Sequence, residues 1–408
     1  MNRALRILPA TATPDATRLV ATRACRGLAD GAVSVVLASY LARLGFSPLQ
    51  VGALVTATLL GSAALTLAIG LFAHRIARRR LLLSACGLMV VTGFAFAQVT
   101  AFWPLLVVAF VGTINPSSGD VTLFLPTEQA VLTETSDAKD RVGLFAWYNV
   151  AGTIAGAVGA LAAGLPDLAA RRLGMPILLA ERTVFLGYSA VGFLTAVLYA
   201  GLSRTIEHGM TGPGRPLSKS RRVVLELSAL FSLDSFGGGF VVQSLLALYL
   251  FRRFALSLET AGAFFFVAGT LAAFSQIVSG RLAARIGHVR TMVYTHLPSN
   301  VFLVVAGLMP TASLAIFFLL LRMALSSMDV PARQAYVMAV VPREERAAAS
   351  SVTNVPRSLA AALSPFVAGF LLEQSVYGWP LVVGGVLKAV YDLLLFARFA
   401  KVPPLEAA

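Results

Sequence analysis

Apolar runs long enough to cross a membrane recur along the whole of this chain. Of its 408 residues, 57% are hydrophobic and only 13% are charged, which is roughly half the charged share of an ordinary soluble domain. One helical crossing of a bilayer needs about 20 mostly apolar residues. We therefore expect an all-α integral membrane protein with twelve transmembrane helices, at about 24–44, 48–73, 81–99, 103–132, 143–165, 182–202, 223–251, 257–283, 290–309, 311–341, 346–374 and 378–399.

A polar stretch interrupts the tenth of these runs, and the same pattern occurs once earlier in the fourth. Pro126-Thr-Glu-Gln129 matches Pro331-Ala-Arg-Gln334, and the match continues without a gap. The pairs at this one offset are Pro126 and Pro331, Gln129 and Gln334, Arg141 and Arg346, Asn149 and Asn354, and Gly164 and Gly369. We infer two six-helix pseudo-repeats, an N-terminal bundle at 1–202 and a C-terminal bundle at 223–408, joined by a cytoplasmic linker at 203–222.

Basic residues are distributed unequally between the two sets of loops. With twelve spans, 23 Lys and Arg residues fall on the side of the termini and 6 on the opposite side. This is a strong positive-inside bias, so we expect a multi-pass protein of a bacterial-type cytoplasmic (inner) membrane with both termini in the cytoplasm. Membrane orientation also explains the net charge of +14, and we expect no nucleic-acid partner.

The loop between the second and third expected spans carries a short motif. It reads Gly70-Leu-Phe-Ala-His-Arg-Ile-Ala-Arg-Arg-Arg80, a glycine followed by a basic cluster. The motif resembles the loop signature of the major facilitator superfamily, although His74 stands where the family usually has Asp and Ala77 where it has Gly. This resemblance, together with the duplication, implies a secondary transporter that works as a monomer in the lipid bilayer.

The family resemblance also implies which residues act. Gating would fall to Arg75 and Arg79, with Glu128 or carbonyl groups at helix ends as partners. The first, fourth, seventh and tenth helices would line a central cavity that binds a small-molecule substrate and protons. The candidates for substrate binding or proton coupling in those helices are Asp30, Asn115, Asp120, Asp234, Gln243, Arg322, Asp329 and Arg333.

Sequence spacing predicts partners for some charged residues. Asp329 and Arg333 are four residues apart, so they share a helix face and can pair. The same spacing predicts that Lys388 and Asp392 neutralise each other.

Two further residues differ from these because no opposite charge lies one turn away. Asp234 has no basic neighbour of this kind, so we expect burial to act strongly on its carboxylate. Arg322 either pairs with a cavity carboxylate such as Asp234 or binds an anionic group of the substrate. Asp120 follows Asn115-Pro-Ser-Ser-Gly119, which predicts an interruption of the fourth helix.

These observations favour proton-driven efflux of a small organic solute. Carboxylates outnumber basic residues in the first and fourth helices, and the fifth is rich in glycine. The alternatives are uptake of an anionic metabolite, with Arg322, Arg333 and Arg357 supplying the positive charge, and a transporter-like sensor. No nucleotide-binding GxxxxGK[ST] motif, HExxH motif or metal-type cysteine pair is present, so we expect no enzymatic activity, no cofactor and no metal.

Overall fold

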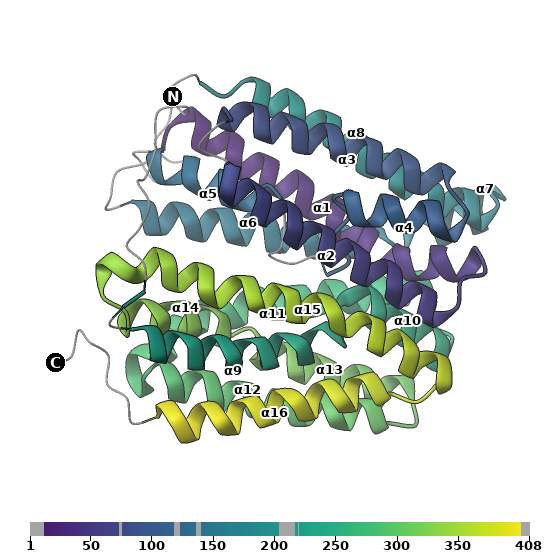
Figure 1. Ribbon diagram of the computed structural model, residues 1–408. Coiled ribbons are helices and arrows are strands. Elements are labelled where there is room, and N and C mark those ends of the chain that lie inside the picture. Colours follow the sequence, from purple (N-terminus) through teal and green to yellow (C-terminus); the bar gives the residue numbers. More distant parts are fainter. Residues whose placement is uncertain are drawn as a thin grey trace, which may run out of the picture. The chain divides into compact units, whose positions relative to one another are not determined.

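The computed structural model describes residues 12–72, 76–117, 123–135, 140–203, 217, 218 and 220–400. These residues form helices joined by short turns, with no strand among them (Figure 1). Eleven helices in this part of the chain are long and apolar enough to cross a membrane, and Phe102–Val111 is a shorter apolar helix. The predicted all-α membrane architecture is confirmed.

The first half of the chain contains eight helices. They are α1 (Pro14–Arg43), α2 (Pro48–Phe72), α3 (Arg78–Gln98), α4 (Phe102–Val111), α5 (Leu125–Glu134), α6 (Arg141–Ala162), α7 (Leu165–Leu173) and α8 (Ile177–Ala200). The fourth predicted span is therefore divided into α4 and α5. After α4, the Asn115 side chain accepts hydrogen bonds from the Ser117 backbone N–H and hydroxyl at 3.1 and 2.9 Å. These bonds favour a turn, and the proline between them cannot donate to a helix.

The second half repeats this pattern of breaks. Its helices are α9 (Arg221–Gly239), α10 (Gln243–Phe254), α11 (Leu258–Ile286), α12 (His288–Leu308), α13 (Ala312–Ser326), α14 (Asp329–Ala339), α15 (Arg346–Gln374) and α16 (Trp379–Phe399), with a short 3₁₀ turn at Arg343–Glu345. The seventh predicted span is divided into α9 and α10, and the tenth into α13 and α14. The first of these breaks follows the three glycines at 237–239.

The chain divides into two compact units. Unit 1 comprises Met1–Leu44, Gly61–Thr211 and Ser257–Phe266. Unit 2 comprises Gly45–Leu60, Gly212–Leu256 and Val267–Ala408.

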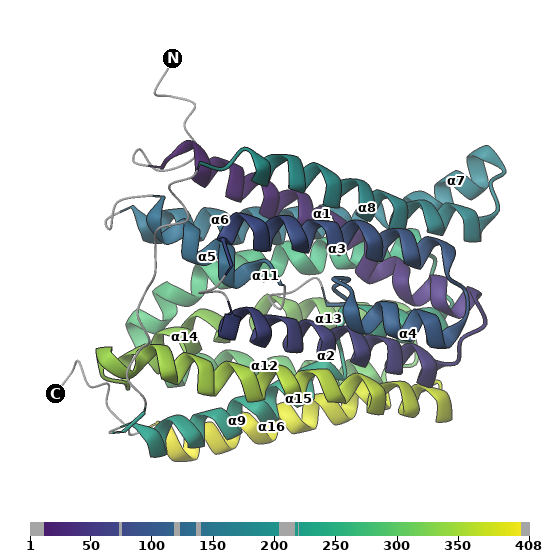
Figure 2. The same ribbon diagram turned by 45° about the horizontal axis from the view of Figure 1, so that its top comes forward.

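In unit 1, α1 packs along α6 and also against α8, while α3 lies beside α8 (Figure 2). The α1–α6 contact depends on glycine. A methyl group on Gly31 would lie 2.0 Å from the Gly156 carbonyl oxygen, and one on Gly159 would lie 1.9 Å from the Leu28 carbonyl oxygen. The two backbones are therefore in direct contact, as in other small-residue helix interfaces in membranes. This packing accounts for glycines of the predicted fifth span.

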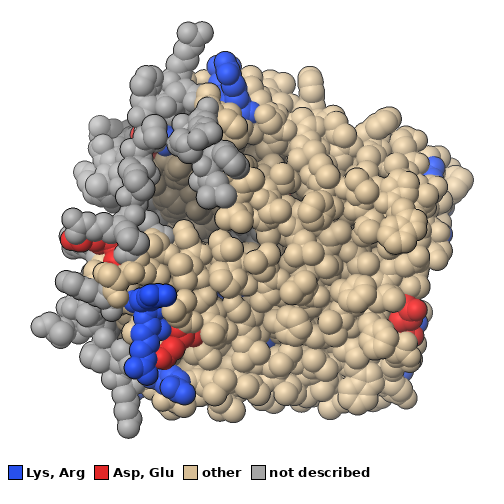
Figure 3. Space-filling model, viewed as in Figure 1, with Lys and Arg blue, Asp and Glu red and all other residues tan. Residues whose placement is uncertain are grey.

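In unit 2, α9 packs against α15 and α16, and α12 against α13, α14 and α16. Its apolar core includes Leu227, Phe231, Met292, Tyr336 and Tyr391. On the face of the molecule seen in Figure 3, Lys, Arg, Asp and Glu side chains gather near the ends of the helices, and the surface along their lengths is almost uncharged. This distribution suits a protein whose helices are surrounded by lipid.

Candidate functional site

A fully buried carboxylate, that of Glu128 on α5, organises the polar interior of unit 1. The Arg26 guanidinium on α1 donates to both of its oxygens, at 3.1 and 2.5 Å. The hydroxyl groups of Tyr148 and Tyr199 each donate at 2.5 Å, and that of Thr22 at 3.0 Å. Paired charge and several donors together offset the cost of burying the carboxylate. Glu128 thus joins helices α1, α5, α6 and α8.

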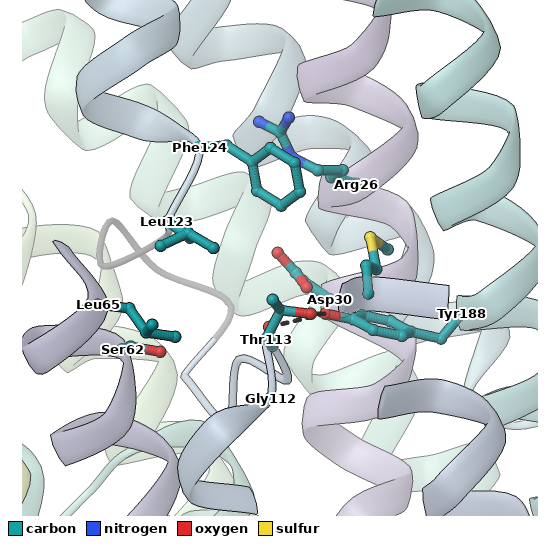
Figure 4. A pocket seen from close by; sticks show the side chains of 10 residues that line it. Arg26, Asp30, Ser62, Leu65, Gly112, Thr113, Leu123, Phe124 and Tyr188 are labelled. Carbon is teal, nitrogen blue, oxygen red and sulfur yellow. Dashed lines mark hydrogen bonds between the residues drawn. The ribbon is translucent and has the colours of Figure 1, made fainter. Parts of the chain in front are cut away.

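A small cavity next to this ion pair contains the carboxylate of Asp30. Figure 4 shows the carboxylate directed into the cavity below Phe124, beside Thr113 and Tyr188. The cavity is about 10 Å³ when measured by the positions open to the centre of a water molecule, which is room for one water. In this conformation the cavity therefore has room for one water molecule or a proton beside the carboxylate.

Asp30 differs from the other buried acidic residues of unit 1 because its carboxylate has no ion-pair or hydrogen-bond partner among the described residues. Arg26, one turn earlier, is committed to Glu128. The Tyr188 hydroxyl donates to the Thr113 carbonyl oxygen at 2.7 Å, so its proton is used. A buried carboxylate in this setting is most stable when it binds a proton or a cation.

Unit 2 holds a larger group of buried charges around Asp234 on α9. Lys388 on α16 places its Nζ 2.5 Å from Asp234 Oδ1. Arg333 on α14 places Nη1 3.3 Å from Asp234 Oδ2 and 3.3 Å from Asp329 Oδ2. All four side chains are buried. The i,i+4 ion pair predicted between Asp329 and Arg333 is therefore present, and it is shared with Asp234.

A second polar pair adjoins this group from α12. His296 Nδ1 lies 2.9 Å from Asp392 Oδ1, and its Nε2 lies 3.8 Å from Asp234 Oδ1. The Asn300 amide donates to Asp392 Oδ2 at 2.8 Å. We call Asp234, Asp329, Arg333, Lys388, His296 and Asp392 the buried charge cluster of unit 2.

Two expectations about partners are corrected here. Lys388 pairs with Asp234 rather than with Asp392, although the latter lies four residues away on the same helix. Asp234 is consequently bound by two cations, neither of which is near it in sequence. The reason is that α16 packs between α9 and α12, so successive polar residues on it meet different neighbours.

The remaining candidates occupy different settings. Arg322 on α13 has a buried Nε that forms no hydrogen bond among the described residues, and its Nη1 donates only to the Met323 sulfur, at 3.2 Å. Gln243 is the first residue of α10 and is half-buried. Arg79 donates to the Ala200 carbonyl oxygen at the end of α8. Asp120, His74 and Arg75 lie outside the described residues.

Several residues of these clusters gave no signal in the sequence. Tyr148, Tyr199 and Thr22 complete the shell of Glu128 from two other helices and from the neighbouring turn of α1. His296 is a single histidine in an ordinary apolar run, and only its contacts with two carboxylates distinguish it. Asn300 lies four residues after His296, and both side chains contact Asp392. This arrangement becomes apparent only when α12 and α16 are packed together.

These buried ion pairs lie inside an all-helical membrane fold. The chain belongs to the Major Facilitator Superfamily, whose sequence profile matches it over residues 19–321 and 235–408. It is similar to an uncharacterized membrane protein of Saccharomyces cerevisiae, YJR124C, with 27% identity over 426 aligned residues, which cover 95% of this chain and 94% of that protein.

Solved structures share the fold. A bacterial homolog of the human lysosomal transporter Spinster, in an inward-facing and occupied conformation, matches with a TM-score of 0.74 and 16% identity over 95% of this chain and 97% of that one. The xylose transporter XylE from E. coli matches with a TM-score of 0.72 and 14% identity, over 96% and 98% of the two chains. The nucleoside transporter NupG matches with a TM-score of 0.72 and 15% identity, over 96% and 100%. Together these findings support a multi-pass secondary transporter.

Proposed function

We propose that this chain is a proton-coupled exporter of small basic organic solutes, working by alternating access. The observation that carries the proposal is Asp30, a buried carboxylate beside a water-sized cavity without an ion-pair partner among the described residues. The same carboxylate can bind a proton or the cationic group of a solute, but not both. Such mutual exclusion produces exchange of one for the other.

Burial supplies the coupling. An empty, ionised carboxylate enclosed away from water costs several kcal/mol. Closure of the site around Asp30 is therefore favourable only when a proton or a cation is bound. A carrier that can change its access only in those two forms moves protons one way and solute the other.

The proposed direction and location follow from charge. We place both termini in the cytoplasm of a bacterial-type cell, with the protein acting as a monomer in the cytoplasmic membrane. The support is the excess of basic residues in loops on the side of the termini. The buried carboxylate of Asp30, which has no ion-pair partner among the described residues, favours a basic solute.

The test uses everted membrane vesicles whose lumen is acidified by respiration. Wild-type vesicles should accumulate labelled organic bases from a panel, and a protonophore should abolish this accumulation. Asp30→Asn should reduce it to the level of vesicles without the protein, because an amide neither exchanges a proton nor pairs with a cation. Asp15→Asn is the matched control on the same helix, since Asp15 is bound to Arg18 and Ser203. Gradient-driven accumulation by Asp30→Asn would contradict the proposal.

Arg322 favours a second candidate, uptake of an anionic solute. Its buried Nε has no hydrogen-bond acceptor among the described residues, and a guanidinium in this state suits a carboxylate or phosphate. The panel therefore includes labelled organic acids, assayed in right-side-out vesicles. If Arg322→Gln abolishes uptake of an acid while Arg322→Lys retains part of it, the protein is an importer. Export of bases that survives Arg322→Gln excludes this candidate.

A further inference from the structure

We propose that unit 2 contains a second proton-binding site, at His296 between Asp392 and Asp234. The use of this proton in transport rests on the proposed function, whereas its binding does not. The site is separate from the Asp30 cavity, because all of its residues belong to the buried charge cluster of unit 2. His296, Asp392 and Asp234 are exposed by only 2%, 0% and 4%.

The first argument is charge compensation at Asp392. Asp234 and Asp329 each have a cation within ion-pair distance, Lys388 or Arg333, and Arg322 acts on both from farther away. Asp392 is fully buried, and His296 is its only ion-pair partner among the described residues. An uncompensated charge in a buried site is strongly destabilising, and a proton on His296 compensates that of Asp392.

The second argument is hydrogen-bond geometry at the imidazole ring. A neutral ring has a single N–H, so one of its nitrogens must present a lone pair. Here both nitrogens face carboxylate oxygens, with Nδ1 2.9 Å from Asp392 and Nε2 3.8 Å from Asp234. Only the Nδ1 contact is within hydrogen-bond distance, whereas Nε2 and Asp234 are within ion-pair distance. A neutral ring can keep the hydrogen bond to Asp392, but only the imidazolium places a positive charge between the two carboxylates.

Other groups also surround His296. Asn300, one turn later on α12, donates an amide proton to Asp392 Oδ2, and its amide nitrogen lies 3.2 Å from His296 Nδ1. The Tyr391 ring lies edge-on to the imidazole, with a centroid separation of 6.1 Å. The titratable and charged groups on the elements around His296 are Asp234 from α9, Arg322 from α13, Asp329, Arg333 and Tyr336 from α14, and Lys388, Tyr391 and Asp392 from α16.

The link to transport runs through Asp234. This carboxylate contacts Lys388, Arg333 and His296, so it connects α9 with α16, α14 and α12. Loss of the His296 proton would remove the positive charge between Asp234 and Asp392. The charged side chains of the cluster would then have to form different ion pairs or contact water. Proton release at His296 is therefore coupled to rearrangement of the ion pairs of Asp234.

The first experiment measures the proton itself. In a full-length variant whose other three histidines are changed to Gln, His296 is the single histidine and can be labelled with ¹⁵N. In lipid nanodiscs at pH 7, its NMR spectrum should show both ring nitrogens protonated. Adding Asp392→Asn removes the charge that the imidazolium compensates and should convert the ring to a neutral form. A neutral ring at pH 7 in the variant that retains Asp392 would overturn the proposal, and the measurement needs no substitution at His296.

The second experiment asks whether the proton is transported. The ratio of protons to solute is measured in proteoliposomes, from the membrane potential at which net flux of an exported base vanishes. His296→Gln should exchange one proton fewer per solute than the wild type, and His288→Gln, at the start of the same helix, should leave the ratio unchanged. An equal ratio in wild type and His296→Gln would overturn the transport role. If the wild type shows no proton dependence, the proposed function fails, while the NMR result still decides whether the site exists.

Discussion

At the scale of single residues, Glu128 shows how a carboxylate can be buried completely when a cation and several hydrogen-bond donors compensate its charge. Five donated hydrogen bonds from four side chains surround its two oxygens. The Arg26 guanidinium also stacks on the Phe124 ring, 4.0 Å from its centroid. Because every partner is itself buried, removal of one charge leaves the other without solvent to compensate it.

The expected effect of Glu128→Gln follows from this burial. The stranded Arg26 charge should destabilise the protein by about 3–5 kcal/mol, seen as a lower thermal unfolding midpoint in detergent. The double variant Arg26→Met with Glu128→Met removes both charges and should recover part of that loss. If the double variant unfolds below both single variants, the pair does not act as a unit. Tyr148→Phe is a control that should cost about 1 kcal/mol, because it removes one hydrogen bond.

Residue spacing predicted one ion pair of this protein and misassigned another. Asp329 and Arg333 lie on the same face of α14, and their pairing is confirmed, although Arg333 also binds Asp234 on α9. Lys388 and Asp392 have the same spacing, but α9 presents Asp234 to the first and α12 presents His296 to the second. Sequence spacing reports which residues share a helix face. It contains no information on what the neighbouring helices present to that face.

At the scale of helices, the number of spans was predictable, but their limits and internal breaks were only partly so. Helix α1 begins at Pro14 rather than near 24, and α7 was not predicted. Apolar run length sets the crossings because the bilayer thickness is fixed. The interruption of the fourth span was predictable from Asn115 and Pro116, since proline removes a donor. The break between α13 and α14, at Ser327–Met328, has a similar marker, because Pro331 cannot donate to the Ser327 carbonyl four residues earlier. Tertiary contacts add to this effect; for example, the Met328 carbonyl accepts a hydrogen bond from Ser279 on α11.

The α1–α6 contact yields a prediction at this scale. Gly31→Ala would force a methyl group to within 2.0 Å of the Gly156 carbonyl oxygen, so the helices must separate. We expect a loss of about 1–3 kcal/mol, measured as a lower midpoint of thermal unfolding. The matched control is Gly87→Ala on α3, where a methyl group meets nothing within 4 Å and helix propensity should improve. Equal midpoints for the two variants would show that the helices do not approach this closely.

At the scale of the whole molecule, the orientation of the chain in the membrane remains a prediction that can be tested directly. Cys25 and Cys86 are first replaced by Ser. Leu173→Cys, at the exposed end of α7, should then react with a membrane-impermeant maleimide on intact cells. Ser218→Cys, in the basic linker, should react only after the cells are permeabilised. The reverse pattern would place the termini outside.

The matching positions of the two pseudo-repeats carry opposite charges, with Glu128 in the first and Arg333 in the second. Each pairs with the first helix of its own half, through Arg26 and Asp234 respectively. Each half therefore has a matched pair of charges, and the polarity of that pair is reversed between the halves. Exchange of one of these segments between the halves would set arginine against arginine or carboxylate against carboxylate. The two segments are therefore not interchangeable unless the first helix of each half is exchanged with them.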